Sequence, residues 1–153
     1  MTDKEEARGF NERNIAEFRA NGAKLSSFGD APILLLTTVG SKTGRQRVTP
    51  TMYMQDDGDR NRVHVFASNA GSDANPDWFN NLVAHPNDVG VEIGRERVQA
   101  SAQVLPEDER AATYAEQGSR YPGFAAYQEM THRRIPVVAL TLLRASPREP
   151  RAT

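Results

Sequence analysis

Three cations surround a glycine turn in the first third of the chain, and no other segment suggests chemistry so directly. Lys42, Arg45 and Arg47 lie close to Gly44, which can adopt the positive φ that such a turn needs. A hairpin of this kind can bind an anion through its side chains. Surface hairpins also carry Lys and Arg for solubility alone, so these residues leave both interpretations open. A nucleotide P-loop is excluded, because Lys42 and Thr43 run through the glycine into a strand instead of opening a helix.

The runs on either side of the turn are typical of β-strands. Residues 33–39 are apolar and partly β-branched, as in a buried strand, whereas residues 47–55 alternate with a period of two. The alternation places the Arg47 guanidinium on one face with two hydroxyls and a phenol, which come from Thr49, Thr51 and Tyr53. We expect this face to form one wall of a cleft that suits a polar, phosphorylated ligand.

The remaining pattern predicts an α+β protein that is mainly antiparallel β. Asn75 as N-cap with Pro76 in the first helical position marks one helix start, and Pro106 followed by acidic residues marks another. We expect helices at 10–28, from 75, from 106 and at 121–130, and strands at 33–39, 47–55, 63–67, 88–94, 96–104 and 135–143. Five or six antiparallel strands with interspersed helices indicate a small barrel or a helix-covered sheet.

The N-terminal region has the spacing of an amphipathic helix. Its apolar stripe consists of Phe10, Phe18, Leu25 and Phe28. This stripe can pack on the rest of the protein, or it can form a mobile lid that also contacts membranes weakly through Arg13, Arg19 and Lys24. We therefore divide the chain into an N-terminal helix or lid at 1–30, one barrel domain at 31–143 and a disordered tail at 144–153.

The composition excludes several kinds of protein. The chain has 153 residues, enough for one domain with a real core, and its net charge of −1 argues against nucleic-acid binding. Because cysteine is absent, disulfides, thiolate nucleophiles and Cys-ligated metals are excluded. His64, His85 and His132 are widely separated, and we expect no metal site. An acidic N-terminus without a long apolar run predicts a soluble, cytoplasmic protein.

The chain is poor in catalytic groups of its own, which points to a bound cofactor. It has no Gly-x-Ser-x-Gly elbow and no evident pair of acids for glycoside chemistry. Besides the cationic turn, it offers a loop at 68–71 and an aromatic series of Tyr121, Phe124 and Tyr127. Spacings of three place these rings on one side of a helix, where they either pack in the core or line a redox pocket in which a cofactor carries the electrons.

Four segments taken together resemble the deazaflavin-dependent nitroreductase family of actinobacteria. They are TTVGSKTGRQRVTP at 37–50, VFASNAG at 65–71, NPDWFNNL at 75–82 and RYP at 120–122, in the order and spacing of that family. The resemblance covers roughly residues 30–143. It implies a split β-barrel related to flavin-binding reductases, with the 8-hydroxy-5-deazaflavin coenzyme F420 as cofactor. The implied reaction is hydride transfer from the reduced coenzyme to quinones, nitroaromatics or other activated acceptors.

The resemblance also implies a coenzyme site, position by position. Lys42 and Arg47 match the positions that hold the phosphate and the anionic glutamate tail, and Arg45 lies beside the tail groove. The positions that line the deazaflavin are matched by Pro50, Ser68, Trp78 and Asn81. The predicted coenzyme site is completed by the rest of the turn and loop, which are Thr43, Gly44, Asn69, Ala70 and Gly71.

For catalysis, the resemblance places Tyr121 and Tyr127 over the substrate pocket, and we predict these two residues and Ser68 as the catalytic residues. A deazaflavin delivers its hydride from a ring carbon, so the protein must hold ring and acceptor face to face and provide a proton source. The phenols can hydrogen-bond the acceptor oxygen, or they can merely close the pocket. Two positions depart from the family. Asn69 stands where the family often has a basic residue, so one expected contact with the glutamate tail is affected. Phe124 stands where some relatives have a tyrosine, which affects the expectation that nitroimidazoles are activated.

Two other functions stay open at this level. One is an FMN-binding reductase of the same barrel type, and the other is a non-catalytic deazaflavin-binding carrier. The expected partner is a small-molecule quinone or nitroaromatic acceptor, with no nucleic acid, and the chain is a monomer or a homodimer. We expect a cytoplasmic location, with weak peripheral contact at the inner face of the membrane if the N-terminal helix acts as a lid.

Overall fold

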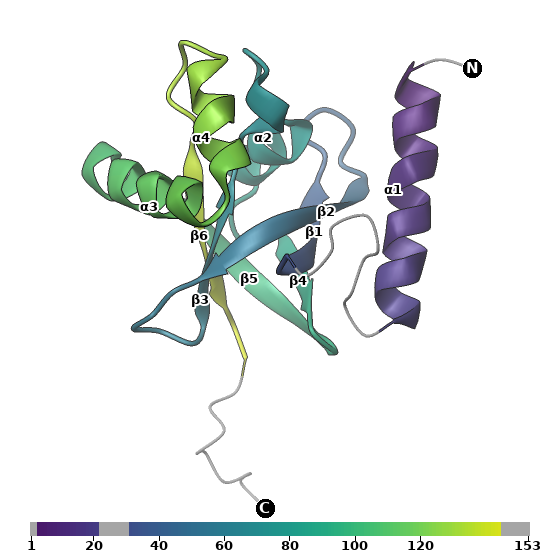
Figure 1. The fold of residues 1–153 in the computed structure, drawn as a ribbon. Helices are drawn as coiled ribbons and strands as arrows, with labels where there is room; N and C mark the ends of the chain where they lie inside the picture. The colour runs from purple at the N-terminus through teal and green to yellow at the C-terminus, as the bar shows by residue number, and fades with distance from the viewer. Residues whose placement is uncertain (1–2, 22–30, 145–153) are drawn as a thin grey trace, which may run out of the picture.

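The structure, a computed structural model, describes residues 3–21 and 31–144 (Figure 1). The helices are α1 (Asp3–Ala20), α2 (Asp77–Ala84), α3 (Glu107–Arg120) and α4 (Pro122–Glu129), with a short 3-10 turn, η2 (Asn69–Gly71). The strands are β1 (Ile33–Val39), β2 (Gln46–Gln55), β3 (Arg62–Phe66), β4 (Val89–Ile93), β5 (Glu96–Val104) and β6 (Val137–Leu142). The helices from 106 and at 121–130 and the predicted strands all recur with small shifts at their ends.

The six strands form a closed barrel. They follow the order β1-β2-β3-β6-β5-β4, and β4 pairs with β1 to close the ring. All the pairings are antiparallel, so consecutive strands are joined mainly by hairpins and short helical connections. The predicted fold class, a mainly antiparallel α+β barrel with short flanking helices, is confirmed.

The antiparallel register places the predicted turn and the predicted loop at one end of the barrel. Val39 pairs with Gln46 around the β1–β2 turn, and Phe66 pairs with Val137, so β3 ends and β6 begins at that same end. Figure 1 shows α2 and α4 there as well, and we call it the α2 end. Segments that are distant in sequence therefore meet at one end of the barrel.

The barrel interior is filled by one apolar cluster. Leu34 and Leu36 of β1 are fully buried in it, together with inward residues of β3, β4, β5 and β6. Trp78 and Leu82 of α2 insert into the same cluster and close the α2 end. Their spacing of four places both side chains on one face of the helix.

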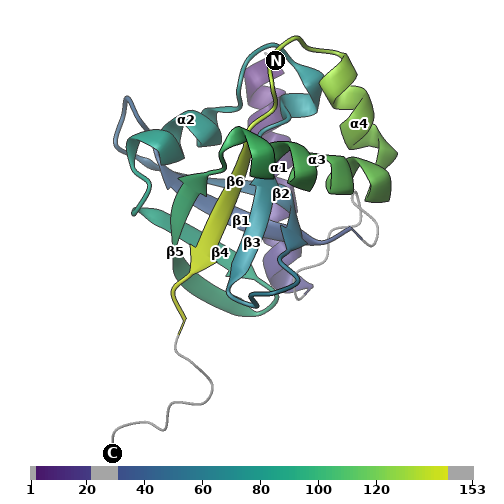
Figure 2. The same cartoon turned by 90° about the vertical axis from the view of Figure 1, so that its left-hand side faces the viewer.

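Two further clusters cover opposite outer sides of the barrel. On one side Phe18 of α1, which is 2% exposed, packs against Ile33 and Leu35. On the other side α3 and α4 cover a cluster that includes Phe66 and Tyr114. Figures 1 and 2 show α1 and the α3–α4 pair separated by the barrel. The outward faces of the strands are thus used for packing helices.

The predicted ends of the chain need correction. The first helix begins at Asp3, before the predicted start at residue 10, and ends at Ala20. Residues 22–30, with Leu25 and Phe28 of the predicted stripe, lie outside the described residues. Arg144, predicted as the start of a disordered tail, donates hydrogen bonds to Asn61 Oδ1 at 2.8 Å and to the Arg60 carbonyl at 2.9 Å. The rest of the tail is not described.

Two helix starts also differ from prediction. Asn75 does not cap α2, because the helix begins at Asp77, the cap position is Pro76, and no side chain bonds the first turn. Tyr121 does not lie within α4 but precedes it as the cap residue, with an extended backbone. In the described residues, no helix is long and apolar enough to span a membrane, and no three acidic or histidine side chains are grouped to hold a metal.

Candidate functional site

The β1–β2 turn is fixed at its base by the main chain. The Gly40 N–H donates to the Arg45 carbonyl at 2.8 Å, and the Gly44 N–H donates to the Gly40 carbonyl at 2.9 Å. Gly44 has a φ of 71°, which confirms the conformation predicted for it. The Thr43 hydroxyl accepts from the Arg45 N–H at 3.2 Å. These bonds define how the cationic side chains leave the turn.

Asn81 of α2 holds this turn through side-chain hydrogen bonds. Its Oδ1 accepts the Ser41 N–H at 2.9 Å, and its Nδ2 donates to the Thr38 hydroxyl at 3.2 Å. The side chain is buried, and both halves of its amide group are satisfied by these bonds. Asn81 therefore acts here as a brace between α2 and the turn, while its contact with a deazaflavin stays a prediction.

The three cations of the turn are free to meet a ligand. Lys42, Arg45 and Arg47 are all exposed, and none forms an ion pair with a carboxylate in the described parts of the chain. The ion pairs that exist lie elsewhere, as between Arg19 and Glu92 at 2.8 Å. An unpaired positive cluster at one end of the barrel is the feature that an anionic ligand requires.

The polar face predicted along β2 is the inward face of the strand, and its role as the wall of a cleft stays a prediction. Thr49 pairs with Leu36 and Thr51 pairs with Leu34, so both hydroxyls lie on the inward face of the barrel. Tyr53 packs against the interior cluster, and burial raises the pKa of its phenol. The period of two is correct, but the sequence alone does not show that β2 curves into a closed barrel. Of this face, only Arg47, at the rim, is exposed.

The predicted loop after β3 has an uncommon backbone. Asn69, Ala70 and Gly71 all have positive φ, at 47°, 54° and 83°. The Ser68 carbonyl accepts the Gly71 N–H at 2.9 Å, and the Asn69 carbonyl accepts the Ser72 N–H at 3.0 Å. The backbone N–H groups of Ser68, Asn69 and Ala70 meet no acceptor among the described residues. Consecutive N–H groups in such a turn form a concavity that favours anions.

The same loop packs closely against α4. A Cβ on Gly71 would lie 2.9 Å from Met130 Sδ and 3.2 Å from the Tyr127 carbonyl oxygen, so this position excludes a side chain. Loop and tyrosine, both predicted for the site, are therefore adjacent in the structure. Ser68 itself is largely buried at the start of the loop, with 8% of its surface exposed.

The three residues of the aromatic series differ in their surroundings: Phe124 packs against other rings, whereas the two tyrosines keep their hydroxyls without a partner in the described residues. Phe124 makes edge contacts with Phe66 and Tyr127, with ring centroids 5.7 and 5.5 Å apart. Tyr127 and Tyr121 are half-buried, and neither phenol donates a hydrogen bond within the described residues. Phe124 thus serves the core, while the two tyrosines keep a hydroxyl free for a ligand.

The structure does not bring every predicted residue to one spot. Pro50 pairs with Leu35 on the outward face of β2, between Val48 and Met52, which pack beside α1. Trp78 is 7% exposed because it fills the interior. A cavity of about 270 Å³ lies at the opposite end of the barrel, between α1 and the β4–β5 hairpin, and contains no predicted site residue.

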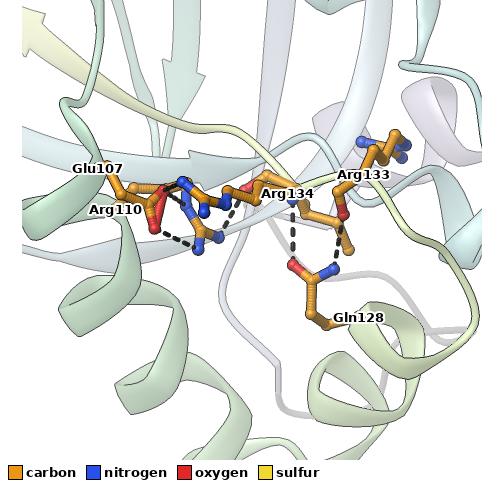
Figure 3. A network of polar contacts seen from close by, with 6 residues as sticks. Glu107, Arg110, Gln128, Arg133 and Arg134 are labelled. Carbon is orange, nitrogen blue, oxygen red and sulfur yellow. Dashed lines mark hydrogen bonds and ion pairs between the residues drawn. The ribbon is translucent and has the colours of Figure 1, made fainter.

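Sequence reasoning missed one residue that contacts the predicted loop. Arg133, in the segment between α4 and β6, bonds the main chain of the loop and the side chain of Asn75. No local pattern marks it, because its acceptors are mostly carbonyls that any residue carries and lie about 60 positions away in sequence. Figure 3 shows Arg133 next to Gln128, with Arg110 and Glu107 on the far side of Arg134.

The geometry thus defines a barrel whose α2 end carries an unpaired cationic turn and a loop with free N–H groups, with Tyr127 of α4 beside that loop. The sequence description of the F420H(2)-dependent quinone reductase family matches residues 11–142. The F420H(2)-dependent quinone reductase Rv1261c of Mycobacterium tuberculosis is 38% identical over 119 residues, which cover 74% of this chain and 75% of that protein.

Solved structures agree with this assignment. An F420-H2 dependent reductase, FDR-A, has 34% identity and a TM-score of 0.62, over 71% of this chain and 93% of that one. A second structure, described as a domain-swapped dimer, has 31% identity and a TM-score of 0.64, over 91% of this chain and 99% of that one. The chain belongs to the F420H(2)-dependent quinone reductase family. The family resemblance is confirmed, and with it the class of F420H2-dependent oxidoreductases.

Proposed function

We propose that the protein uses reduced F420 to reduce quinones, with the coenzyme bound across the α2 end of the barrel. The proposal is carried by one observation: three cations without ion-pair partners in the described chain and a loop that favours anions lie at the same end of a barrel of this family. F420 carries a phosphate and an anionic glutamate tail, so its charge is opposite to that of the turn. The FMN alternative has no support among the relatives, whose names specify F420.

The residues present fit the coenzyme. Lys42, Arg45 and Arg47 would hold its phosphate and anionic tail, because they are exposed and lack competing carboxylates in the described chain. The free N–H groups of residues 68–70 would meet an anionic or carbonyl oxygen of the bound molecule. When bound, the deazaflavin supplies the hydride. This chain would orient the coenzyme and the acceptor and exclude water from the space between them.

On the acceptor side, we propose that Tyr121 and Tyr127 meet the oxygen of the bound quinone. Their hydroxyls are unpartnered among the described residues, and the backbone of Tyr127 touches the loop at Gly71. A phenol held there can donate a hydrogen bond to an oxygen as negative charge develops on it. Nitroaromatics, which also present oxygens to a donor, are the second acceptor class that we propose.

A titration of the purified protein tests the proposal. We expect oxidised F420 to bind more tightly than FMN, and reduced F420 to be consumed when a soluble quinone is added. Tight binding without turnover would indicate a carrier, and preference for FMN would indicate a reductase of the flavin type. Size-exclusion chromatography with light scattering separates monomer from homodimer; a homodimer is supported by the related structure that is described as a domain-swapped dimer.

Residues 1–30 are proposed as a lid that also touches membranes. The support is that α1, which packs on the outer face of β2, keeps Arg13 exposed to solvent, where it can meet an anionic headgroup. Co-sedimentation with anionic liposomes measures the membrane contact. Sedimentation equal to that of a chain beginning after residue 30 would contradict it.

A further inference from the structure

Arg133 lies in the connection between α4 and β6 and forms four hydrogen bonds across to the predicted coenzyme loop. Its Nε donates to the Ser72 carbonyl at 2.9 Å and its Nη1 donates to Asn75 Oδ1 at 2.8 Å. Its Nη2 donates to the carbonyls of Ala67 at 3.1 Å and Ser68 at 2.9 Å. The acceptors span residues 67–75, so one side chain fixes the whole loop.

The bonds from Arg133 determine which way the N–H groups of the loop point. In a trans peptide, the C=O of one residue and the N–H of the next point in opposite directions. Because the carbonyls of Ala67 and Ser68 face the guanidinium, the N–H groups of Ser68 and Asn69 face away from it. These are two of the three N–H groups that meet no acceptor in the described residues.

The loop needs such a support because its backbone is strained. Asn69 and Ala70 hold positive φ without being glycine, a conformation that is unfavourable for a residue with a Cβ. Such conformations persist only where the surroundings determine them. The internal bonds of the loop are few, and two of its residues, Asn69 and Ala70, are exposed. The guanidinium supplies the contacts that the loop itself lacks.

Arg133 is in turn held by its own segment. The Gln128 side chain accepts the Ile135 N–H at 3.1 Å and donates to the Arg133 carbonyl at 2.7 Å (Figure 3). The Thr131 hydroxyl accepts the Arg133 N–H at 3.3 Å and donates to Asp73 Oδ1 at 2.7 Å. The end of α4 and the start of β6 therefore present the guanidinium in one orientation.

We propose that Arg133 is a positioning residue for the coenzyme: it orients the peptides of the 67–72 loop so that their N–H groups face the bound F420. The inference rests on the proposed function, in which this loop contacts the coenzyme. Arg133 donates to four neutral acceptors through a planar fork, which a lysine ammonium cannot reproduce. Arg133 acts through the loop, without touching the coenzyme.

The test compares R133K with R110K in the full chain. Arg110 is a matched control, because it also donates to a main-chain carbonyl, that of Ile135 at 3.1 Å, and pairs with Glu107, yet it does not touch the loop. We expect R133K to bind oxidised F420 at least about tenfold more weakly, or ~1.4 kcal/mol. R110K should change affinity by less than about twofold, although both lose stability.

Two further readouts separate positioning from charge and from general destabilisation. R133K keeps its positive charge, so the factor by which it weakens F420 binding should be the same at about 0.05 and 0.5 M salt. A weakening caused by loss of an attracting charge would shrink at high salt, because salt screens that attraction. In protein without coenzyme, the amide protons of Gly71 and Ser72 should exchange faster in R133K and unchanged in R110K. If R133K folds too poorly, N75A removes one acceptor alone and should weaken binding by about two- to fivefold.

The outcomes distinguish this inference from the proposed function. Wild-type protein that fails to bind F420 overturns both. Wild-type protein that binds F420, with R133K or N75A equal to it in affinity and in amide exchange, overturns the role of Arg133 alone. Equal weakening in R133K and R110K reduces the effect to stability and also overturns it.

Discussion

Lys42 and Arg47 are the residues on which the coenzyme assignment depends most directly. Both are exposed at the α2 end without an acidic partner in the described chain, so their charges are available to a ligand. We expect replacement of both by alanine to weaken F420 binding at least about tenfold, ~1.4 kcal/mol, as measured by fluorescence titration. The effect should shrink at high salt, because exposed charges are screened.

The matched control for this double variant is R95A. Arg95 is also an exposed arginine in a β-hairpin turn, but it lies at the opposite end of the barrel. We expect its affinity for F420 to equal that of the wild type. Equal affinity of wild type and the Lys42 and Arg47 double variant would contradict the assignment of the turn.

Tyr121 and Tyr127 separate the coenzyme side of the site from the acceptor side. Their substitution by phenylalanine keeps each ring, including the edge contact between Tyr127 and Phe124, and removes only a hydroxyl. We expect nearly unchanged F420 affinity, and at least one variant should lower quinone turnover, because a donor to the developing oxygen charge is lost. If steady-state rates of both variants match the wild type, the phenols only line the pocket.

At the residue scale, the sequence reveals those site residues that lie in contiguous motifs. Gly44 and the surrounding cations can be recognised because a turn requires particular residue types at adjacent positions. Arg133 cannot, because three of its four acceptors are main-chain carbonyls and all four are distant in sequence. Asn75 carries a clear capping signal, yet its side chain bonds Arg133, so a long-range contact replaces the local one.

At the scale of elements, α1 is the segment whose role is least determined by its sequence. Phe18 is buried against Ile33 and Leu35, and Arg19 pairs with Glu92 at 2.8 Å. We expect F18A to lower the free energy of unfolding by about 3 kcal/mol, because a buried aromatic ring is replaced by a cavity. Denaturant unfolding measures this, and R13A, on the exposed side of α1, should be within about 0.5 kcal/mol of wild type.

The same variant tests the lid. If α1 covers the acceptor site, F18A and a chain beginning after residue 30 should retain F420 affinity but show a raised KM for a long-tailed quinone. A large fall in melting temperature with unchanged quinone selectivity would instead make α1 a purely structural element. The comparison uses a short-tailed quinone as the control acceptor.

Strands are easier to predict than the surfaces they present. The runs at 33–39 and 96–104 coincide with β1 and β5, because apolar and alternating patterns limit strand position closely. The same patterns do not show which face is concave. The sequence pattern therefore groups Thr49 and Thr51 on one face, and only the pairing of β2 with β1 shows that this face points inward.

For the whole molecule, the α2 end depends on braces that join separate elements. Asn81 links α2 to the β1–β2 turn, and Arg133 links the α4–β6 connection to the loop after β3. Tyr114 adds a third brace, because its hydroxyl donates to the Phe124 carbonyl at 2.6 Å and ties α3 to α4. The site residues on α4 are therefore positioned through the packing of α3.

Tyr114 makes the stability of the whole molecule sensitive to alkaline pH. Burial raises the pKa of its phenol from 10.0 to about 12. Above pH 10 the unfolded chain releases this proton while the folded chain keeps it, so the contribution is complete below pH 10 and is lost as pH rises toward 12. The expected loss is up to about 2–3 kcal/mol, since one pKa unit corresponds to about 1.4 kcal/mol.

The variant Y114F isolates the contribution of the Tyr114 hydroxyl to the free energy of unfolding. At neutral pH it should be less stable than wild type by about 1 kcal/mol, because the bond to the Phe124 carbonyl is removed while the ring stays packed against Phe66. Between pH 10 and 12 its free energy of unfolding should fall less steeply than that of wild type, so the two curves converge and then cross as the pH approaches 12. Y53F is a control with a partly buried phenol whose pKa is also raised but which makes no bond to α4. Parallel curves for wild type and Y114F in urea unfolding would show that Tyr114 ionises equally in both states.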